Sequence, residues 1–276
     1  MRISLCNEVI GALAFEQQCA LAAELGYDGL EIAPFTLSSD PHLLSASQRA
    51  ALRRNASDAG IAITGLHYLL RAPDGLSITS ADAALRTRSV EVMRRLCDLA
   101  ADLGAKVVVH GSPDQRQLAR GDEADGRKRG AACFAAVASA AEAAGITYCI
   151  EPLSPDQTGF VHTIAEAAAI ARQIDSPAVK TMLDCSSAAR GGETEEIPQL
   201  ISHWLPTGLI GHVHFNDPNR RGPGEGALGF HPILSALRAH GYAGDAAIEP
   251  FIYRPDGATC AARSIGYIRG ILETLS

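Results

Sequence analysis

The chain has 276 residues, of which 47% are hydrophobic and 20% charged, and it carries a net charge of −7. This balance fits a globular protein with a large core. It argues against a protein that wraps nucleic acid, because phosphate contacts need a basic surface. We expect no membrane partner, since no run reaches the roughly 18 apolar residues that a membrane span requires.

The N-terminal segment MRISLCNEVIGALAF predicts a first strand rather than a signal peptide. It is only mildly apolar, and Asn7 and Glu8 interrupt it. The seven cysteines are odd in number and irregularly spaced, without a C-x-x-C pair. These features indicate reduced thiols and a cytoplasmic protein.

Short apolar runs alternate with longer alanine- and leucine-rich stretches along the whole chain. The runs predict eight strands, at residues 2–6, 29–35, 61–69, 106–112, 146–152, 179–185, 209–215 and 245–251. The stretches between them, such as 15–26, 89–104 and 130–145, have helical spacing, and several stop at a glycine before the next strand.

This strict β-then-α order predicts βαβ units and a parallel sheet. Eight such units indicate one closed (β/α)₈ TIM barrel, an α/β fold, over residues 1–276. An open doubly wound sheet is the alternative. It is disfavoured because LCNEVIGALAF, around the first strand, lacks a glycine-rich phosphate fingerprint.

Polar residues stand where the predicted strands end, which is where barrels place active-site groups. The last four strands end in Glu151, Asp184, His214 and Glu249. A single strand-end carboxylate is usually solvated or ion-paired, but four such residues on consecutive strands would converge on one point. Three carboxylates and one imidazole suit an octahedral divalent ion such as Mn²⁺, Mg²⁺ or Co²⁺. Zn²⁺ is the alternative, although it usually takes fewer ligands with more nitrogen or sulfur.

The seventh strand carries the tripeptide HVH. His212 and His214 face the same side of the strand because side chains alternate along it. We choose His214 as the ligand since it lies nearer the strand end, and we expect His212 to fill the barrel below it.

Four motifs in order carry a resemblance that spans essentially the whole chain. They are IEP (150–152), LDCS (183–186), GHVHFNDPNRRGPGEG (211–226) and IEPF (248–251). With them the chain resembles the xylose isomerase-like TIM-barrel superfamily, in the sugar phosphate isomerase/epimerase branch that includes the D-tagatose and D-psicose 3-epimerases.

The resemblance implies roles for particular residues. Glu151, Asp184, His214 and Glu249 would bind one divalent metal ion, Mn²⁺ first among the candidates. The two glutamates would also act as the catalytic acid/base pair, and Arg220 would bind the substrate.

Two positions depart from the epimerase pattern. Ser187 stands where the epimerases carry a histidine, and Gln157 where they carry a glutamate. Both family residues hold one end of the ketose, so Ser187 and Gln157 are expected to contact the substrate and to change its identity.

His67 and His110 are expected to line the sugar pocket, and a second metal between them and Glu151 remains an open alternative.

Together these features predict an isomerase or epimerase that acts on a keto sugar or related polyol derivative. The reaction would begin with proton abstraction beside a carbonyl and pass through a metal-bound enediolate. A 1,2-isomerase, or a dehydratase or lyase acting on a keto sugar or inosose, would share that first step. The exact substrate, its phosphorylation and the metal's identity stay open.

Two further classes are disfavoured. An endonuclease IV-like phosphodiesterase would need a third metal site, but Ser187 replaces one of its histidines and GALGFHP lacks an Asp-x-His pair. A non-catalytic sugar-binding barrel would not need a full set of ligands and an acid/base pair.

Superfamily members are often dimers or tetramers, so a homodimer or homotetramer is compatible with the sequence.

Two loops attract attention. Residues 216–226 contain Arg220 and Arg221, which could bind phosphate, carboxylate or sugar hydroxyls; for Arg221 we expect simple solvation. The charged stretch 113–130 predicts either a lid over the pocket or an exposed helix start.

Overall fold

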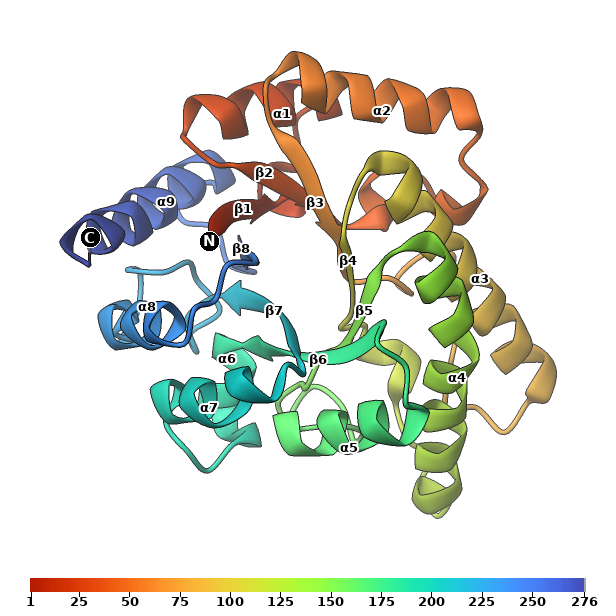
Figure 1. Cartoon of the computed structure of the whole chain (residues 1–276). Helices are drawn as coiled ribbons and strands as arrows, with labels where there is room; N and C mark the ends of the chain where they lie inside the picture. The colour runs from red at the N-terminus through yellow and green to blue at the C-terminus, as the bar shows by residue number, and fades with distance from the viewer. Residues whose placement is uncertain (276) are drawn as a thin grey trace.

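The computed structural model describes residues 1–275, which form a closed barrel of eight parallel strands in sequence order (Figure 1). The predicted barrel and all eight strands are confirmed. The strands are β1 (Arg2–Cys6), β2 (Gly29–Ile32), β3 (Ala62–Leu66), β4 (Val107–His110), β5 (Thr147–Ile150), β6 (Val179–Asp184), β7 (Ile210–Phe215) and β8 (Asp245–Ile248).

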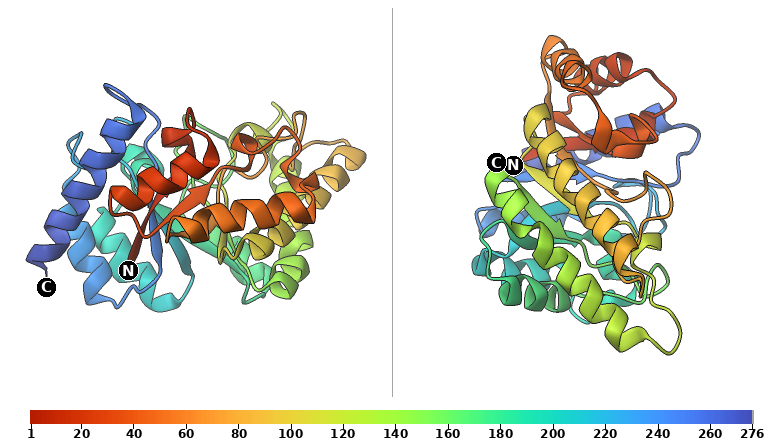
Figure 2. Two further views of the ribbon diagram at one scale, coloured as in Figure 1. Left: turned by 90° about the horizontal axis from the view of Figure 1, so that it is seen from above. Right: turned by 90° about the vertical axis from the view of Figure 1, so that its right-hand side faces the viewer.

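Helices surround the barrel as an outer layer, and both termini lie at the same end of it (Figure 2). The main helices are α1 (Phe15–Glu24), α2 (Ala46–Asp58), α3 (Ala83–Leu103), α4 (Glu123–Ala144), α5 (Ile164–Ile174), α7 (Ile197–Trp204), α8 (Phe230–Ala239) and α9 (Gly257–Thr274). Shorter helical turns are η1 (Asn7–Ile10), η2 (Pro34–Thr36), η3 (Pro41–Leu43), η4 (Asp114–Arg116), α6 (Cys185–Ser187), η5 (Ala188–Gly192) and η6 (Leu205–Thr207).

Helix α3 shows how local chemistry sets the element boundaries. The Asp82 side chain accepts a hydrogen bond from the backbone N–H of Ala84 at 2.8 Å, so the helix begins directly after Asp82, at Ala83. Gly104 ends it with φ of 84°, a left-handed conformation that suits glycine. The sequence pattern placed this helix start too late, at residue 89, because Arg86, Thr87 and Arg88 interrupt the apolar spacing after Leu85.

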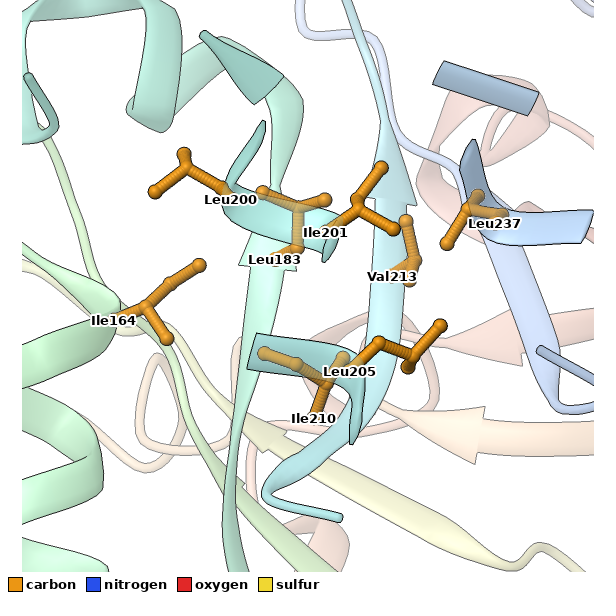
Figure 3. A pocket seen from close by; sticks show the side chains of 8 residues that line it. All are labelled: Ile164, Leu183, Leu200, Ile201, Leu205, Ile210, Val213 and Leu237. Carbon is orange, nitrogen blue, oxygen red and sulfur yellow. The ribbon is translucent and has the colours of Figure 1, made fainter. Parts of the chain in front are cut away.

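The core has two layers, one inside the barrel and one between the strands and the helices. The inner layer includes a small cluster of Val107, Val109, Cys149 and Met182, which come from strands alone. The outer layer is larger. It leaves a gap of only about 10 Å³ between strands β6 and β7 and helices α5, α7 and α8, and Figure 3 shows its aliphatic lining. The lining residues are Ile164, Leu183, Leu200, Ile201, Leu205, Ile210, Val213 and Leu237. Such a gap offers no polar partner to water or a ligand and is a packing feature.

The barrel closes where β1 pairs with β8. At the first paired position, the Arg2 guanidinium donates two hydrogen bonds to the Asp245 carboxylate, at 2.7 and 2.8 Å. The strand register shifts at two other places, between Leu30 and Glu31 and between Thr181 and Leu183. Such irregularities redirect side chains and are common next to active sites.

All seven cysteines are free and buried. Across residues 1–275, no helix combines the length and the apolar character needed to cross a bilayer.

Candidate metal centre and active site

The structure brings the four predicted metal ligands together at the ends of strands β5 to β8. Glu151 and Glu249 each follow their strand by one residue, Asp184 ends β6, and His214 is the last residue but one of β7. One donor atom from each lies within 4.8 Å of the others, and all four residues are buried. The strands therefore deliver three oxygen donors and one nitrogen donor to a single point.

The His214 ring points its Nδ1 atom at the three carboxylates. Nδ1 lies 3.1 Å from Glu249 Oε2, 3.7 Å from Glu151 Oε1 and 3.9 Å from Asp184 Oδ2. Three buried carboxylates so close together repel one another unless a cation or protons compensate them. The arrangement fits a divalent ion that prefers oxygen and imidazole ligands.

Burial and crowding shift the acidity of these groups. Burial raises the pKa of Glu249 to about 8, with Glu151 adding to the effect and His214 opposing it. Burial and Glu151 likewise raise the pKa of Asp184 to about 6. Burial opposes charging of the His214 imidazole, but Glu249 and Glu31 outweigh it and raise the His214 pKa well above its usual value. The crowded carboxylates thus favour a bound positive charge, either a proton or a cation.

Asp184 is fixed in place through both carboxylate oxygens. Oδ1 accepts a hydrogen bond from the Ser187 backbone N–H at 2.6 Å, and Oδ2 accepts one from the Asn216 side-chain amide at 2.7 Å. Asn216 also accepts a hydrogen bond from the Ser186 N–H at 2.7 Å. Sequence reasoning missed Asn216, although it lies two residues after His214 and side chains alternate along a strand.

Glu151 has a different kind of support. A Cβ atom at Gly111 would lie 1.5 Å from Glu151 Oε2, so only glycine leaves room for this carboxylate. The fully buried Arg116 donates a hydrogen bond to the Glu151 carbonyl oxygen at 2.7 Å. The stretch 113–130 was expected to be a lid or an exposed helix start. The part from Glu123 onward does begin helix α4, whereas Arg116 anchors the end of β5 from inside the protein.

His214 makes a second contact on its other face. Its Nε2 lies 2.9 Å from Oε1 of Glu31, and the Nε2 of His212 lies 2.6 Å from Oε2 of the same carboxylate. Burial would raise the pKa of Glu31, but His212 and His214 hold that pKa well below its usual range. His212 lies inside the barrel, where it was expected.

His67 lies between two carboxylates. Its Nε2 is 2.9 Å from Glu8 Oε1, and its Nδ1 is 3.6 Å from Glu31 Oε1. Burial disfavours the charged ring, yet Glu8 and Glu31 raise the His67 pKa to about 9. Donor atoms of Cys6, Glu8, His67 and Glu249 also lie within 4.8 Å of one another. Within that group, His67 and Glu8 already pair with each other.

A polar cavity of about 10 Å³, the same size as the aliphatic gap in the outer core layer, is lined in part by three of the four ligands, Glu151, Asp184 and Glu249. Its lining residues are Tyr68, Gly111, Glu151, Leu153, Gln157, Asp184, Ser186, Ser187, Arg190, Glu249 and Phe251. The Gln157 side-chain oxygen accepts hydrogen bonds from the hydroxyls of Ser154 at 2.6 Å and Ser187 at 3.4 Å. The two positions that depart from the epimerase pattern thus touch each other on one wall. Arg190, which sequence reasoning missed, adds a cation to the lining.

The structure does not bring the two predicted pocket histidines into this lining. His110 Nδ1 lies 2.6 Å from the Tyr148 hydroxyl, and the His110 ring packs against Phe134 of α4, away from the cavity. His67 is buried beside Glu8 as described. Their contact with a substrate stays a prediction that these contacts do not support.

The two arginines after β7 have separate positions. Arg220 has φ of 66°, and its carbonyl accepts hydrogen bonds from the backbone N–H groups of Phe251 and Ile252. Its guanidinium lies 5.1 Å from the ring centre of Phe251, which lines the cavity, although Arg220 itself is not part of the lining. The expectation of simple solvation for Arg221 is wrong, because Arg221 pairs with the buried Glu225 at 2.9 Å.

Fold and site together define a (β/α)₈ barrel with a metal-compatible centre at the carboxyl ends of its strands. Residues 19–271 match the family model described as "Xylose isomerase-like TIM barrel". The chain belongs to this family.

Similar proteins agree on the class. D-psicose 3-epimerase of Agrobacterium fabrum is 29% identical over 83% of this chain and 77% of its own length. L-ribulose 3-epimerase of Mesorhizobium japonicum is 29% identical over 86% and 75%. A solved D-psicose 3-epimerase with D-tagatose, from Clostridium cellulolyticum H10, matches the fold with a TM-score of 0.83 at 22% identity over 99% of both chains. These relatives place the chain among the family's enzymes of the isomerase and epimerase class.

Proposed function

We propose that this protein is a divalent-metal-dependent epimerase or isomerase of a keto sugar or related polyol derivative. The observation that carries the proposal is the convergence of Glu151, Asp184, His214 and Glu249 beside a cavity. The relatives named for psicose and ribulose, both ketoses, support the substrate class.

These four residues would hold the metal, Mn²⁺ first among the candidates. When bound, the ion supplies positive charge that stabilises negative charge developing on a substrate carbonyl oxygen. Hard oxygen donors with one imidazole suit Mn²⁺, Mg²⁺ or Co²⁺ better than a structural zinc site.

Glu151 and Glu249 are the proposed acid/base pair. Both line the cavity, and they come from strands separated by β6 and β7. A substrate between them would present opposite faces of one carbon, so one carboxylate could remove a proton and the other return one.

The cavity wall is proposed to orient the substrate. Gln157 and Ser187 offer an amide and a hydroxyl to sugar hydroxyl groups, and Arg220 would close over the cavity beside Phe251. Neutral groups at positions 157 and 187 would select a substrate through hydrogen bonding at the end remote from the reacting carbon.

A deuterium-exchange screen tests this function. Purified protein with Mn²⁺ is incubated in D₂O with ketoses, keto-sugar phosphates, keto-glycosides and inososes, and products are followed by proton NMR. We expect deuterium at a carbon next to the carbonyl, together with an epimer or isomer. Loss of water or another leaving group would instead identify a dehydratase or lyase. A protein that binds metal but exchanges no proton in any of these compounds would overturn the proposal.

A further inference from the structure

Glu31 is a fully buried carboxylate outside the set of four ligands, and its side-chain contacts are with histidines. Its Oε1 lies 2.9 Å from Nε2 of His214, and its Oε2 lies 2.6 Å from Nε2 of His212. A buried carboxylate is costly unless its oxygens are paired. Oε1 makes a hydrogen bond with His214, and Oε2 lies at ion-pair distance from His212, so each oxygen of Glu31 faces a histidine nitrogen.

The fold makes specific room for Glu31 at the end of β2. The pairing register between β2 and β3 shifts between Leu30 and Glu31, which redirects the side chain. On the neighbouring strand, a Cβ atom at Gly65 would lie 3.2 Å from Glu31 Oε2 and 2.7 Å from a Val107 methyl group. A strand irregularity and a glycine therefore combine to put this charge behind the metal centre.

The geometry of His214 gives this placement a consequence. A neutral imidazole carries its proton on one nitrogen and a lone pair on the other. Because Glu31 faces Nε2, it favours the tautomer with the proton on Nε2. The lone pair then lies on Nδ1, which faces Glu151, Asp184 and Glu249.

We propose that Glu31 is the positioning residue of the metal centre: it fixes the tautomer and orientation of His214 and makes Nδ1 the metal-binding atom. The inference rests on the proposed metal site. Carboxylates behind metal-binding histidines raise ligand basicity, and their loss typically weakens metal binding by 10- to 100-fold. His212 holds the second oxygen and keeps Glu31 from turning away.

Metal affinity of purified variants tests the proposal without any need for substrate. Mn²⁺ and Co²⁺ dissociation constants are measured by competition with a chelator. We expect Glu31→Gln to weaken binding roughly 10- to 100-fold and to alter the visible absorption spectrum of bound Co²⁺. Glu31→Asp keeps the charge and should fall between the wild type and Glu31→Gln.

A matched control separates positioning from general support of the fold. The side chain of Glu225 is also buried, with 4% exposed, but it pairs with Arg221 and Arg263 and touches no ligand. Glu225→Gln should leave the metal dissociation constant unchanged, even if it lowers thermal stability. Equal affinities for the wild type and a folded Glu31→Gln would overturn the proposal.

A measurement on the wild type covers the case in which Glu31→Gln does not fold. In Zn²⁺-loaded protein labelled with nitrogen-15 histidine, NMR should show a protonated Nε2 and an unprotonated Nδ1 for His214. The opposite tautomer would overturn the role of Glu31. Tight metal binding with no proton exchange on any sugar would contradict the proposed function alone, whereas a wild type that binds no divalent metal would contradict both.

Discussion

The two halves of the barrel use polar strand-end residues in opposite ways. At the ends of β5 to β8, three carboxylates crowd around one histidine nitrogen. Behind them, at the end of β2, one carboxylate pairs across the barrel with two histidines of β7, and His67 after β3 pairs with Glu8. The first arrangement has excess negative charge that calls for a cation, and the second is already compensated. Strand-end position alone therefore does not identify a ligand; the charge balance of its neighbours does.

The largest expected effect is on catalysis, from Glu151→Gln and Glu249→Gln. Each removes a proton-transfer group while keeping side-chain size, so exchange of substrate protons in D₂O should fall about 10²- to 10⁴-fold. NMR exchange rates at saturating Mn²⁺ check this. Full activity in both variants would remove the assigned roles, provided that thermal melting shows a folded barrel.

Removing a metal ligand should weaken metal binding much more than removing a carboxylate from the compensated half of the barrel. Asp184→Asn should weaken Mn²⁺ binding by about 100-fold or more. This loss exceeds the usual effect of changing a residue that only orients a ligand. Glu8→Gln, in the compensated half, should change it little because Glu8 pairs with His67. Equilibrium dialysis measures both. A larger loss for Glu8→Gln than for Asp184→Asn would reverse the comparison.

Metal binding should strengthen as pH rises through the range set by two raised pKa values. Asp184, with a pKa of about 6, and Glu249, with a pKa of about 8, must lose their protons to bind a cation. In the metal-free protein, a rise in pH should instead lower the stability of the folded state. Carboxyl groups whose pKa is raised on folding destabilise the folded state as they ionise, so stability should fall between about pH 5 and pH 8.

Thermal melts at several pH values, with and without Mn²⁺, measure these two opposite pH dependences. The stabilisation by Mn²⁺ should grow from pH 5 to pH 8. A stabilisation that is constant over this range would show that neither carboxyl group exchanges its proton for the metal.

A smaller effect is expected from Asn216→Ala. The change removes a donor to Asp184 Oδ2 and an acceptor for the Ser186 N–H. Metal affinity should fall roughly tenfold, the lower end of the range for groups that orient ligands. An unchanged dissociation constant, measured by the same chelator competition, would show that Asp184 needs no such support.

The smallest effect is expected at the barrel closure, far from either polar cluster. Arg2 is half exposed, and its pair with Asp245 lies at the start of β1. Arg2→Ala should cost less than about 1 kcal/mol of unfolding free energy and leave metal binding unchanged. Urea denaturation checks the first point, and a larger loss would mean that closure depends on this pair.

The sequence was sufficient for the fold because apolar runs and helical stretches alternate without interruption. It was also sufficient for the convergence of the four ligands, since parallel strands bring their carboxyl ends together. Side-chain direction was harder to predict. Side chains alternate along β4, so His110 points to the same side as Val108 and faces helix α4. Val107 and Val109 point the other way, into the interior of the barrel.

The role of Glu31 could not be predicted, because it depends on a register shift and on which histidines meet across the barrel. Arg116 was missed for a similar reason. A buried arginine that binds a backbone carbonyl 35 residues further along the chain leaves no local pattern in the sequence. Asn216 could have been predicted from the sequence. It lies two residues after His214, and the alternation of side chains along a strand had already been used for His212 and His214.

The location of bound Mn²⁺ tests the central claim most directly. Crystals of the Mn²⁺-loaded protein, measured by anomalous diffraction, should show one strong peak bounded by His214 Nδ1 and the carboxylates of Glu151, Asp184 and Glu249. A peak among Cys6, Glu8 and His67, or no peak at saturating Mn²⁺, would contradict the account.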